Sequence, residues 1–163
     1  MSYLLDANIF MAAARTYYHP ELVPSFWGWL EREVVAGHVH SIVNVREEIE
    51  GGDDGDFLKR WIEPLPDSFW LDPHADAQRE IKRVTRWATC RDLDYKEAAR
   101  AKFLTGADSF LVAMALAEGH VVVTDEVSEP NSKKNIKIPD ACTAHGVGYK
   151  NPFDLYRQLG MRL

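Results

Sequence analysis

The feature that most constrains the fold of this 163-residue chain is the alternation of very short apolar runs with helical segments. Tyr3–Leu5 and the β-branched run Val121–Val123 are typical of strands buried in a sheet. The segments 75–89 and 108–118 between them carry apolar residues at helical spacing. Because parallel strands are joined through crossover helices, this alternation predicts an α/β fold with a mostly parallel sheet covered on both faces.

The rest of the chain fits the same pattern. Further helices are expected over 9–17, from Pro24 to 36, and over 45–50, 57–62, 95–104 and 152–159. Further strands are expected over 38–42, 69–71, 136–139 and 146–149, and a loop over 51–55. With no repeat, linker or change of composition in between, residues 1–163 are expected to form a single domain.

Composition narrows the class of protein. Apolar residues make up 46% and charged residues 27% of the chain, which is typical of a globular protein. No apolar run approaches the roughly 18 residues that a membrane-spanning helix needs, so no membrane partner is expected. The two cysteines, Cys90 and Cys142, are far apart and are expected to be reduced, small core residues of a cytoplasmic protein.

The formal net charge of −6 argues against general nucleic-acid binding, but the charges are segregated. Between Asp76 and Lys102 there are eight lysines and arginines against five acids. Four of these bases share one face of the helix expected over 75–89: Arg79, Lys82, Arg83 and Arg86. This stripe is either a track for an RNA backbone or the solvated face of an amphipathic helix, and the sequence favours neither.

Acidic residues recur where a parallel sheet would place its ligand site, beyond the carboxyl ends of the strands. Asp6 follows the first strand, Glu48 lies beside the apolar stripe of a helix, and Asp108 begins a buried helix. Asp125 and Glu126 follow the strand over 121–123 and Thr124. Each acid has a simpler interpretation as a helix cap or a loop residue. Together they indicate a crevice lined by carboxylates.

Carboxylates gathered in one crevice repel each other unless a cation lies between them. A site with oxygen ligands alone suits Mg²⁺ or Mn²⁺. Such ions activate water and neutralise charge when water displaces a group at phosphorus. The acids therefore predict a metal-dependent phosphoryl or phosphodiester chemistry.

Four segments resemble the motifs of PIN-domain nucleases, in the family's order and over nearly the whole chain. They are Leu4-Leu5-Asp6-Ala7-Asn8, Val45-Arg46-Glu47-Glu48-Ile49, Ala107-Asp108-Ser109-Phe110-Leu111-Val112-Ala113 and Val122-Val123-Thr124-Asp125-Glu126. The tail from Ile136 to Cys142, followed by Gly146-Val147, resembles an uncharacterised PIN-like branch. Members of the family are often the toxins of bacterial toxin–antitoxin pairs.

This resemblance implies a three-layer α/β/α sandwich with Asp6, Glu48 and Asp108 as metal-binding, catalytic acids. Asn8 would support the first acid. The family has Thr, any residue and then Asp, so Thr124 places Glu126 in the register of the fourth acid and Asp125 one residue early. The implied activity is cleavage of RNA by a Mg²⁺- or Mn²⁺-dependent endoribonuclease, and the implied partner is an antitoxin.

The sequence contains further candidate binding residues and is compatible with other functions. Lys133 and Lys134 are further candidates for phosphate contact because they lie close to Glu126 in the sequence. The aromatic residues Tyr17, Tyr18 and Trp61 are expected on the surface, where they would mark a homodimer or antitoxin interface. The rival functions are a catalytically inactive PIN-fold binding module, a Mg²⁺-dependent aspartyl-phosphate phosphatase and a receiver domain.

Overall fold

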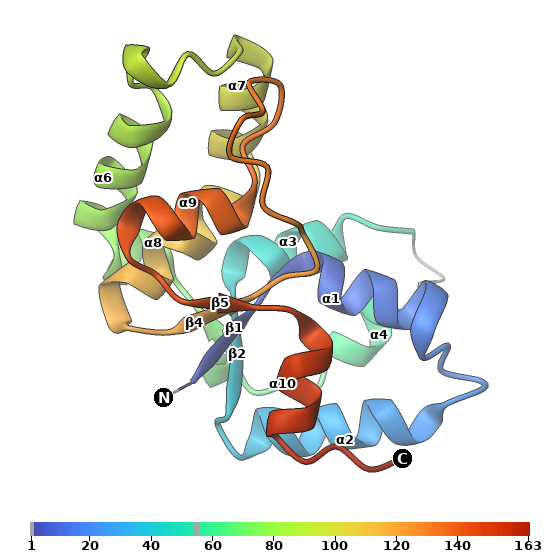
Figure 1. Cartoon of the computed structure of the whole chain (residues 1–163). Coiled ribbons are helices and arrows are strands. Elements are labelled where there is room, and N and C mark those ends of the chain that lie inside the picture. The colour runs from blue at the N-terminus through green and yellow to red at the C-terminus, as the bar shows by residue number, and fades with distance from the viewer. Residues whose placement is uncertain (1, 54–55) are drawn as a thin grey trace.

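A five-stranded parallel sheet lies at the centre of the molecule in the computed structural model, which describes residues 2–53 and 56–163 (Figure 1). The strand order is β3-β2-β1-β4-β5, and every neighbouring pair is parallel. The strands are β1 (Tyr3–Leu5), β2 (Val39–Ile42), β3 (Trp70–Leu71), β4 (Val121–Val123) and β5 (Tyr149–Lys150). Asp54 and Gly55, in the loop expected over 51–55, lie outside the described residues.

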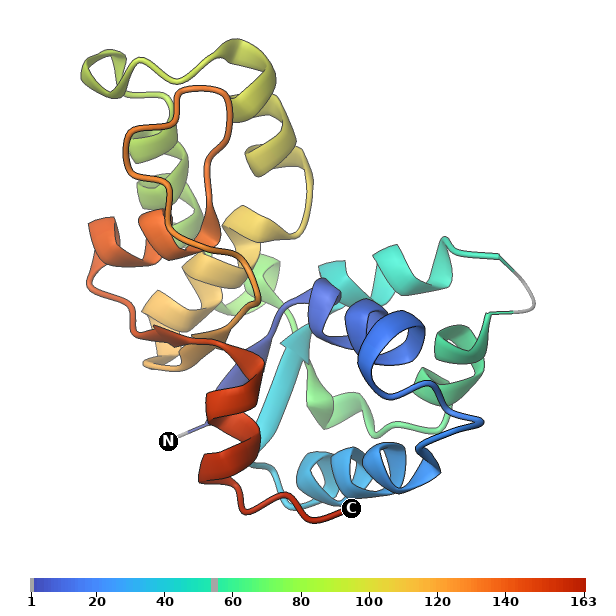
Figure 2. The ribbon, with the colours of Figure 1, turned by 45° about the vertical axis from the view of Figure 1, so that its right-hand side comes forward.

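Helices cover both faces of this sheet, so the chain forms the expected α/β/α sandwich (Figures 1 and 2). One face carries α1 (Ala7–Ala12), α2 (Pro24–Val35), α3 (Val43–Glu50), α4 (Phe57–Ile62) and α10 (Pro152–Gln158). The other carries α5 (Pro73–Asp76), α6 (Gln78–Ala88), α7 (Glu97–Thr105), α8 (Asp108–Glu118) and α9 (Ile138–His145). A π-helical turn, Ala13–Tyr17, extends α1.

The position of β1 in the sheet determines where Asp6, the residue that follows it, lies. Leu4 pairs with His40 of β2 on one side and with Val122 of β4 on the other, and its side chain is fully buried. Since β1 is the middle strand, Asp6 follows it at the centre of the carboxyl edge of the sheet. The Asp6 amide donates a hydrogen bond to the carbonyl of Val123 at 3.0 Å, which ties this residue to the end of β4.

Helix α8 is buried because it packs between the sheet and the outer helices. Its side chains from Leu111 to Ala115 are at most 1% exposed. It ends at Gly119, whose φ of +75° lies in the left-handed region that glycine adopts without strain. The start of this helix, at Asp108, is thereby held next to the carboxyl ends of β1 and β4.

Three expectations about secondary structure are wrong. The helix expected over 75–89 is two helices, because Ala77 has a non-helical φ of −137° between α5 and α6. Ile136 and Ile138 are buried at a spacing of two, which imitates a strand, but α9 begins at Ile138 with proline in its first turn. The last strand is limited to Tyr149–Lys150, since Gly146 ends α9 with a φ of +68°.

Two expectations about burial are also wrong. Trp61 is only 7% exposed, because it packs against Phe10 and Trp27 inside the layer of α1, α2 and α4. Cys90 is exposed beyond the end of α6, whereas Cys142 is buried as expected. Among the helices of the described residues, none is both long and apolar enough to cross a membrane.

Candidate active site

Asp6 is a buried acid at the centre of the site, with an exposed fraction of 3%. It occupies the N-cap position of α1, but its side chain makes no capping hydrogen bond within the described part of the chain. One carboxylate oxygen instead accepts a hydrogen bond from Thr124 Oγ1 at 3.0 Å. Burial, followed by the charge of Asp108, raises the pKa of Asp6 to about 8. The capping interpretation of this residue is therefore wrong.

Thr124 connects Asp6 to the acid two residues further along the chain. Its hydroxyl donates to Asp6 and accepts a hydrogen bond from the backbone N–H of Glu126 at 3.1 Å. Oε2 of Glu126 accepts a hydrogen bond at 2.7 Å from the backbone N–H of Ile138, the first residue of α9. The end of β4, the acid Glu126 and the start of α9 are thus held together.

Asp108 is the third acid, and it begins α8 without a capping hydrogen bond among the described residues. Burial, followed by the charges of Glu126 and Glu48, raises the pKa of Asp108 to about 7, against a smaller opposite effect of Lys102 and Lys137. Asp108 therefore lies within electrostatic reach of two acids from different elements. Its interpretation as a helix cap is wrong.

Glu48 approaches the site from α3 and contacts the turn before α8. Its Oε1 atom accepts a hydrogen bond from the backbone N–H of Ala107 at 3.2 Å. Gly106 lies in the same turn, and a Cβ atom there would be 3.2 Å from the carbonyl oxygen of Lys102, a tight contact with the end of α7. The structure thus brings Asp6, Glu48, Asp108 and Glu126 to one edge of the sheet from four separate segments.

A cavity of about 170 Å³ lies beside these acids. Asp108 and Glu126 line it together with three cationic side chains: Lys102, Lys134 and Lys137. Carboxylates and ammonium groups around one small cavity suit a ligand that carries both a cation and an anion. A phosphate group neutralised by a divalent cation is such a ligand.

The structure separates the two acids that follow Thr124. Glu126 faces Asp108, whereas Asp125 lines an aromatic cavity with Tyr17, Tyr18 and Phe153. The charge of Asp125 still contributes to the raised pKa of Asp6, less than that of Asp108 or Glu126. Glu126 is therefore the neighbour of the other acids, in agreement with the register of Thr124, and Asp125 lies at the border of the site.

Of the other predicted site residues, Lys134 lines the site cavity, and Asn8, Lys133 and the basic stripe lie away from it. Asn8 is exposed, and Thr124 rather than Asn8 is hydrogen-bonded to Asp6. Nζ of Lys133 donates to the carbonyl of Leu93 and lies over the ring of Tyr95, while Lys134 lines the site cavity. The basic stripe of α6 is exposed and contributes no residue to that cavity in the described structure: Arg79, Lys82, Arg83 and Arg86.

Sequence reasoning missed three residues around the site. Lys102 and Lys137 reach the cavity from α7 and from the residue before α9, positions that no local motif marks. Asn44 lies one helical turn before Glu48, and its side-chain oxygen is buried without a hydrogen-bond partner among the described residues. The spacing of four residues between Asn44 and Glu48 is the sequence feature that could have indicated that both lie on the same face of α3.

The donor set fits a hard divalent cation in its chemistry. It consists of the carboxylate oxygens of Asp6, Glu48, Asp108 and Glu126, and such ligands suit Mg²⁺ or Mn²⁺. A cation would also relieve the repulsion that raises the pKa values of Asp6 and Asp108. Across residues 2–53 and 56–163, however, no three His, Cys, Asp or Glu side chains lie close enough together to coordinate one metal ion.

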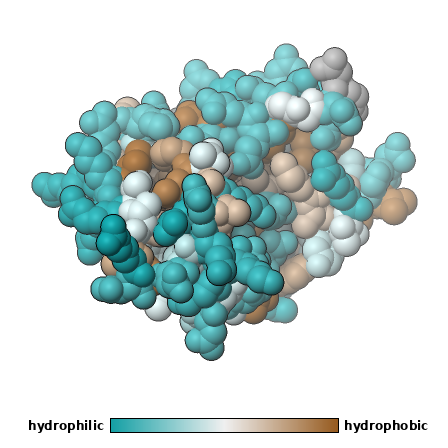
Figure 3. Space-filling view, turned by 90° about the horizontal axis from the view of Figure 1, so that it is seen from above, coloured by the Kyte–Doolittle hydropathy of each residue, from teal (hydrophilic) through white to brown (hydrophobic). Residues whose placement is uncertain are grey.

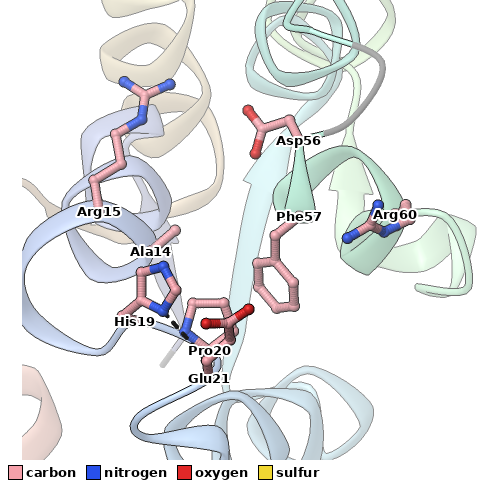
Figure 4. Close-up of a pocket in the computed structure, with 8 residues that line it drawn as sticks. All are labelled: Ala14, Arg15, His19, Pro20, Glu21, Asp56, Phe57 and Arg60. Carbon is pink, nitrogen blue, oxygen red and sulfur yellow. Dashed lines mark hydrogen bonds between the residues drawn. The ribbon is translucent and has the colours of Figure 1, made fainter.

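A larger cavity of about 620 Å³ lies away from the acids, between the end of the π-helical turn and α4 (Figure 4). Its lining carries both charges: the cations Arg15 and Arg60 line it together with the acids Glu21 and Asp56.

The surface seen from above is mostly hydrophilic, and apolar residues appear only in separate patches (Figure 3).

Comparison with known proteins agrees with this architecture. A family model described as a domain of unknown function, DUF4411, matches residues 3–163. The chain belongs to this family. A search of curated proteins finds no match. Among solved structures, a chain in the crystal structure of VapBC2 from Rickettsia felis bound to a DNA fragment from their promoter is similar, with a TM-score of 0.54 and 17% identity.

This similarity covers 93% of the DUF4411 chain and 98% of the VapBC2 chain. It therefore concerns the whole arrangement of strands and helices. The PIN-like fold that the four short motifs implied is confirmed.

Proposed function

We propose that this DUF4411 protein is a divalent-metal-dependent endoribonuclease and the toxin of a toxin–antitoxin pair. The observation that carries the proposal is the convergence of Asp6, Glu48, Asp108 and Glu126 at the carboxyl edge of the sheet, next to a cavity lined by lysines. Carboxylates bind a cation and lysines bind phosphate. A phosphodiester is the substrate that needs both.

Each side chain has a role that follows from its surroundings. Asp6 and Asp108 would hold the cation together with Glu48 and Glu126, and the bound ion would supply charge neutralisation and an activated water. The Thr124 hydroxyl fixes the orientation of the Asp6 carboxylate.

Lys102 and Lys134 line the cavity and can bind the non-bridging oxygens of a phosphate. They would hold the substrate strand in register while the acids hold the cation. Of the acids, Glu126 rather than Asp125 belongs to this set, because it faces the same cavity as Asp108.

The expected partner is a cognate antitoxin protein. The similar solved structure is that of VapBC2 bound to a DNA fragment from their promoter, which supports looking for a partner of this kind. Of the three aromatic residues expected to mark a homodimer interface, Trp61 is in the core. The exposed Tyr17 and the half-buried Tyr18 are the two that still support such an interface.

The test is cleavage of a mixed panel of single-stranded and folded RNAs with Mg²⁺, with Mn²⁺ or with EDTA. Wild-type protein is compared with Asp6→Asn and Glu126→Gln, and with Asp76→Asn as the matched control on the exposed surface of α5. We expect metal-dependent cutting by wild type and control. The two site variants should lose at least about a hundredfold in rate, since each removes a charge that holds the cation.

Other outcomes lead to the rival functions. Equal cutting by all four proteins would refute the assignment of the site. If none of them cuts, borohydride trapping of a phosphorylated aspartate would favour the phosphatase or receiver domain. Absence of both activities would leave an inactive binding module.

A further inference from the structure

An aromatic groove runs from the border of the acid site along α10. It consists of two adjoining cavities, of about 30 Å³ and 280 Å³, that share Tyr18, Phe153 and Tyr156. The smaller cavity includes Tyr17 and Asp125, and the larger one includes Arg157 and Arg162. We call these seven residues the aromatic groove.

The inner wall of the aromatic groove is fixed by packing, while its outer rings are accessible. Tyr18 is stacked on the buried Phe26, with 4.2 Å between ring centroids and 8° between planes. Tyr17 and Phe153 meet edge to face at 5.3 Å, and they are 54% and 37% exposed. Such rings present free aromatic surface at low conformational cost.

The two ends of the aromatic groove differ in charge. Asp125 lies at the end next to the acid site, and its charge contributes to the raised pKa values of both Asp6 and Tyr156. Arg162 lies at the other end beside Arg157, whose guanidinium is paired with Asp154 at 2.8 Å. The groove therefore offers a hydrogen-bond acceptor, aromatic rings and cations in sequence.

We propose that the aromatic groove binds one unpaired nucleotide of the RNA strand, next to the bond that is cut. Its base stacks on the ring of Phe153 and meets Tyr17 edge to face, and its flanking phosphate contacts Arg162. Asp125 accepts a hydrogen bond from an amino group of the base, a donor that uracil lacks. This inference rests on the proposed function, because the strand has to reach the acids.

The dimensions and charges favour a nucleotide over a protein partner. A cavity of 280 Å³ suits one ring system with its sugar, whereas an amphipathic helix from another protein needs an extended apolar groove. A carboxylate and a guanidinium on either side of the rings match the base edge and the phosphate of one nucleotide. An apolar protein surface bound in the aromatic groove would offer no partner to the charges of Asp125 and Arg162.

The test measures binding without cleavage. Random-sequence RNA octamers that carry 2-aminopurine are titrated with protein in EDTA, and the fluorescence quenching gives Kd. The variant is Phe153→Leu, which keeps an apolar side chain but removes the ring. The matched control is Tyr149→Leu, because Tyr149 is 43% exposed on β5 and lines neither cavity of the aromatic groove.

We expect Phe153→Leu to raise Kd about tenfold, while Phe153→Tyr and the Tyr149 control stay near the wild-type value. Unlabelled octamers of uridine should compete with the labelled octamers more weakly than unlabelled octamers of cytidine do, and Asp125→Asn should reduce this difference. Arg162→Gln should lower the slope of log Kd against log salt concentration by about one, the amount that corresponds to one phosphate contact.

The proposal is overturned if Phe153→Leu binds RNA as wild type does, or if its effect is a change of oligomeric state in size-exclusion chromatography. Cleavage by wild type with unchanged binding by Phe153→Leu would refute the aromatic groove and leave the nuclease intact. Weaker binding by Phe153→Leu without any cleavage by wild type would support the aromatic groove and refute the nuclease.

Discussion

The substitution Asp6→Asn should stabilise the metal-free protein at alkaline pH. Asp6 is 3% exposed, and its pKa is raised from an ordinary value of 3.8 to about 8 by burial and by the charge of Asp108. The folded state therefore favours the protonated form of the Asp6 carboxyl group, and burying the ionised form costs free energy. Asparagine has nearly the same shape, stays neutral at every pH and can still accept the hydrogen bond of Thr124.

The sign and size follow from proton linkage. Between pH 4 and pH 8 the unfolded chain has lost the Asp6 proton and the folded chain has kept it, so stability falls as pH rises through this window. One such group changes the free energy of unfolding by about 1.4 kcal/mol per pH unit. The full rise from 3.8 to about 8 corresponds to roughly 6 kcal/mol.

The measurement is urea unfolding in EDTA at each pH from 5 to 9, followed by tryptophan fluorescence. At pH 5 the variant should be more stable than wild type by only about 2 kcal/mol, since Asp6 is then neutral in the folded state and pH 5 is little more than one unit above its ordinary pKa of 3.8 in the unfolded chain. The variant should become steadily more stable than wild type up to pH 8. The exposed acid variant Asp76→Asn should follow wild type throughout.

Addition of Mg²⁺ or Mn²⁺ at pH 8 should reduce the stability advantage of Asp6→Asn over wild type. A cation that binds only the folded state stabilises it in proportion to the logarithm of its concentration, and Asp6→Asn removes a ligand charge from the site. A constant difference between variant and wild type from pH 5 to 9 would refute the electrostatic reasoning. Equal stabilisation of both by the metal would refute the role of Asp6 in binding it.

Three further predictions concern single contacts. Thr124→Val should lower the free energy of unfolding by about 1–3 kcal/mol in the same urea assay, since the buried Asp6 loses its donor. Lys102→Met should raise KM for RNA more than it lowers kcat, and an unchanged KM would contradict a phosphate contact of this lysine. Gly119→Ala should reduce stability by about 1 kcal/mol because the glycine φ is +75°, and a gain in stability would refute that argument.

The sequence predicted the sheet and the place of its main acid for one physical reason. A run as short and apolar as Leu4–Leu5 is typical of a strand that is buried on both faces, as in the middle of a parallel sheet, and both side chains are fully buried. The residue after such a strand lies at the carboxyl edge, so the position of Asp6 follows from local pattern alone. The same reasoning holds for β4 and the acids after it.

Local pattern fails where tertiary contacts decide. Ile136 and Ile138 are both buried, as in a strand, but Pro139 favours the first turn of a helix and α9 starts there. Lys102 belongs to the site only because α7 packs beside the start of α8. The start of α9 has a local signature in Pro139, which the burial of the two isoleucines outweighs in a sequence-based prediction, whereas the place of Lys102 has no such signature.

The two acids after Thr124 show how much one residue of register matters. Asp125 and Glu126 carry the same charge in the same turn, yet one lines the aromatic groove and the other lines the cavity of Asp108. The difference comes from one hydrogen bond inside the motif and one outside it: the Thr124 hydroxyl accepts from the Glu126 amide, and the Ile138 amide donates to the Glu126 carboxylate. A shift of α9 by one residue would therefore move the fourth acid out of the site without any change in the motif.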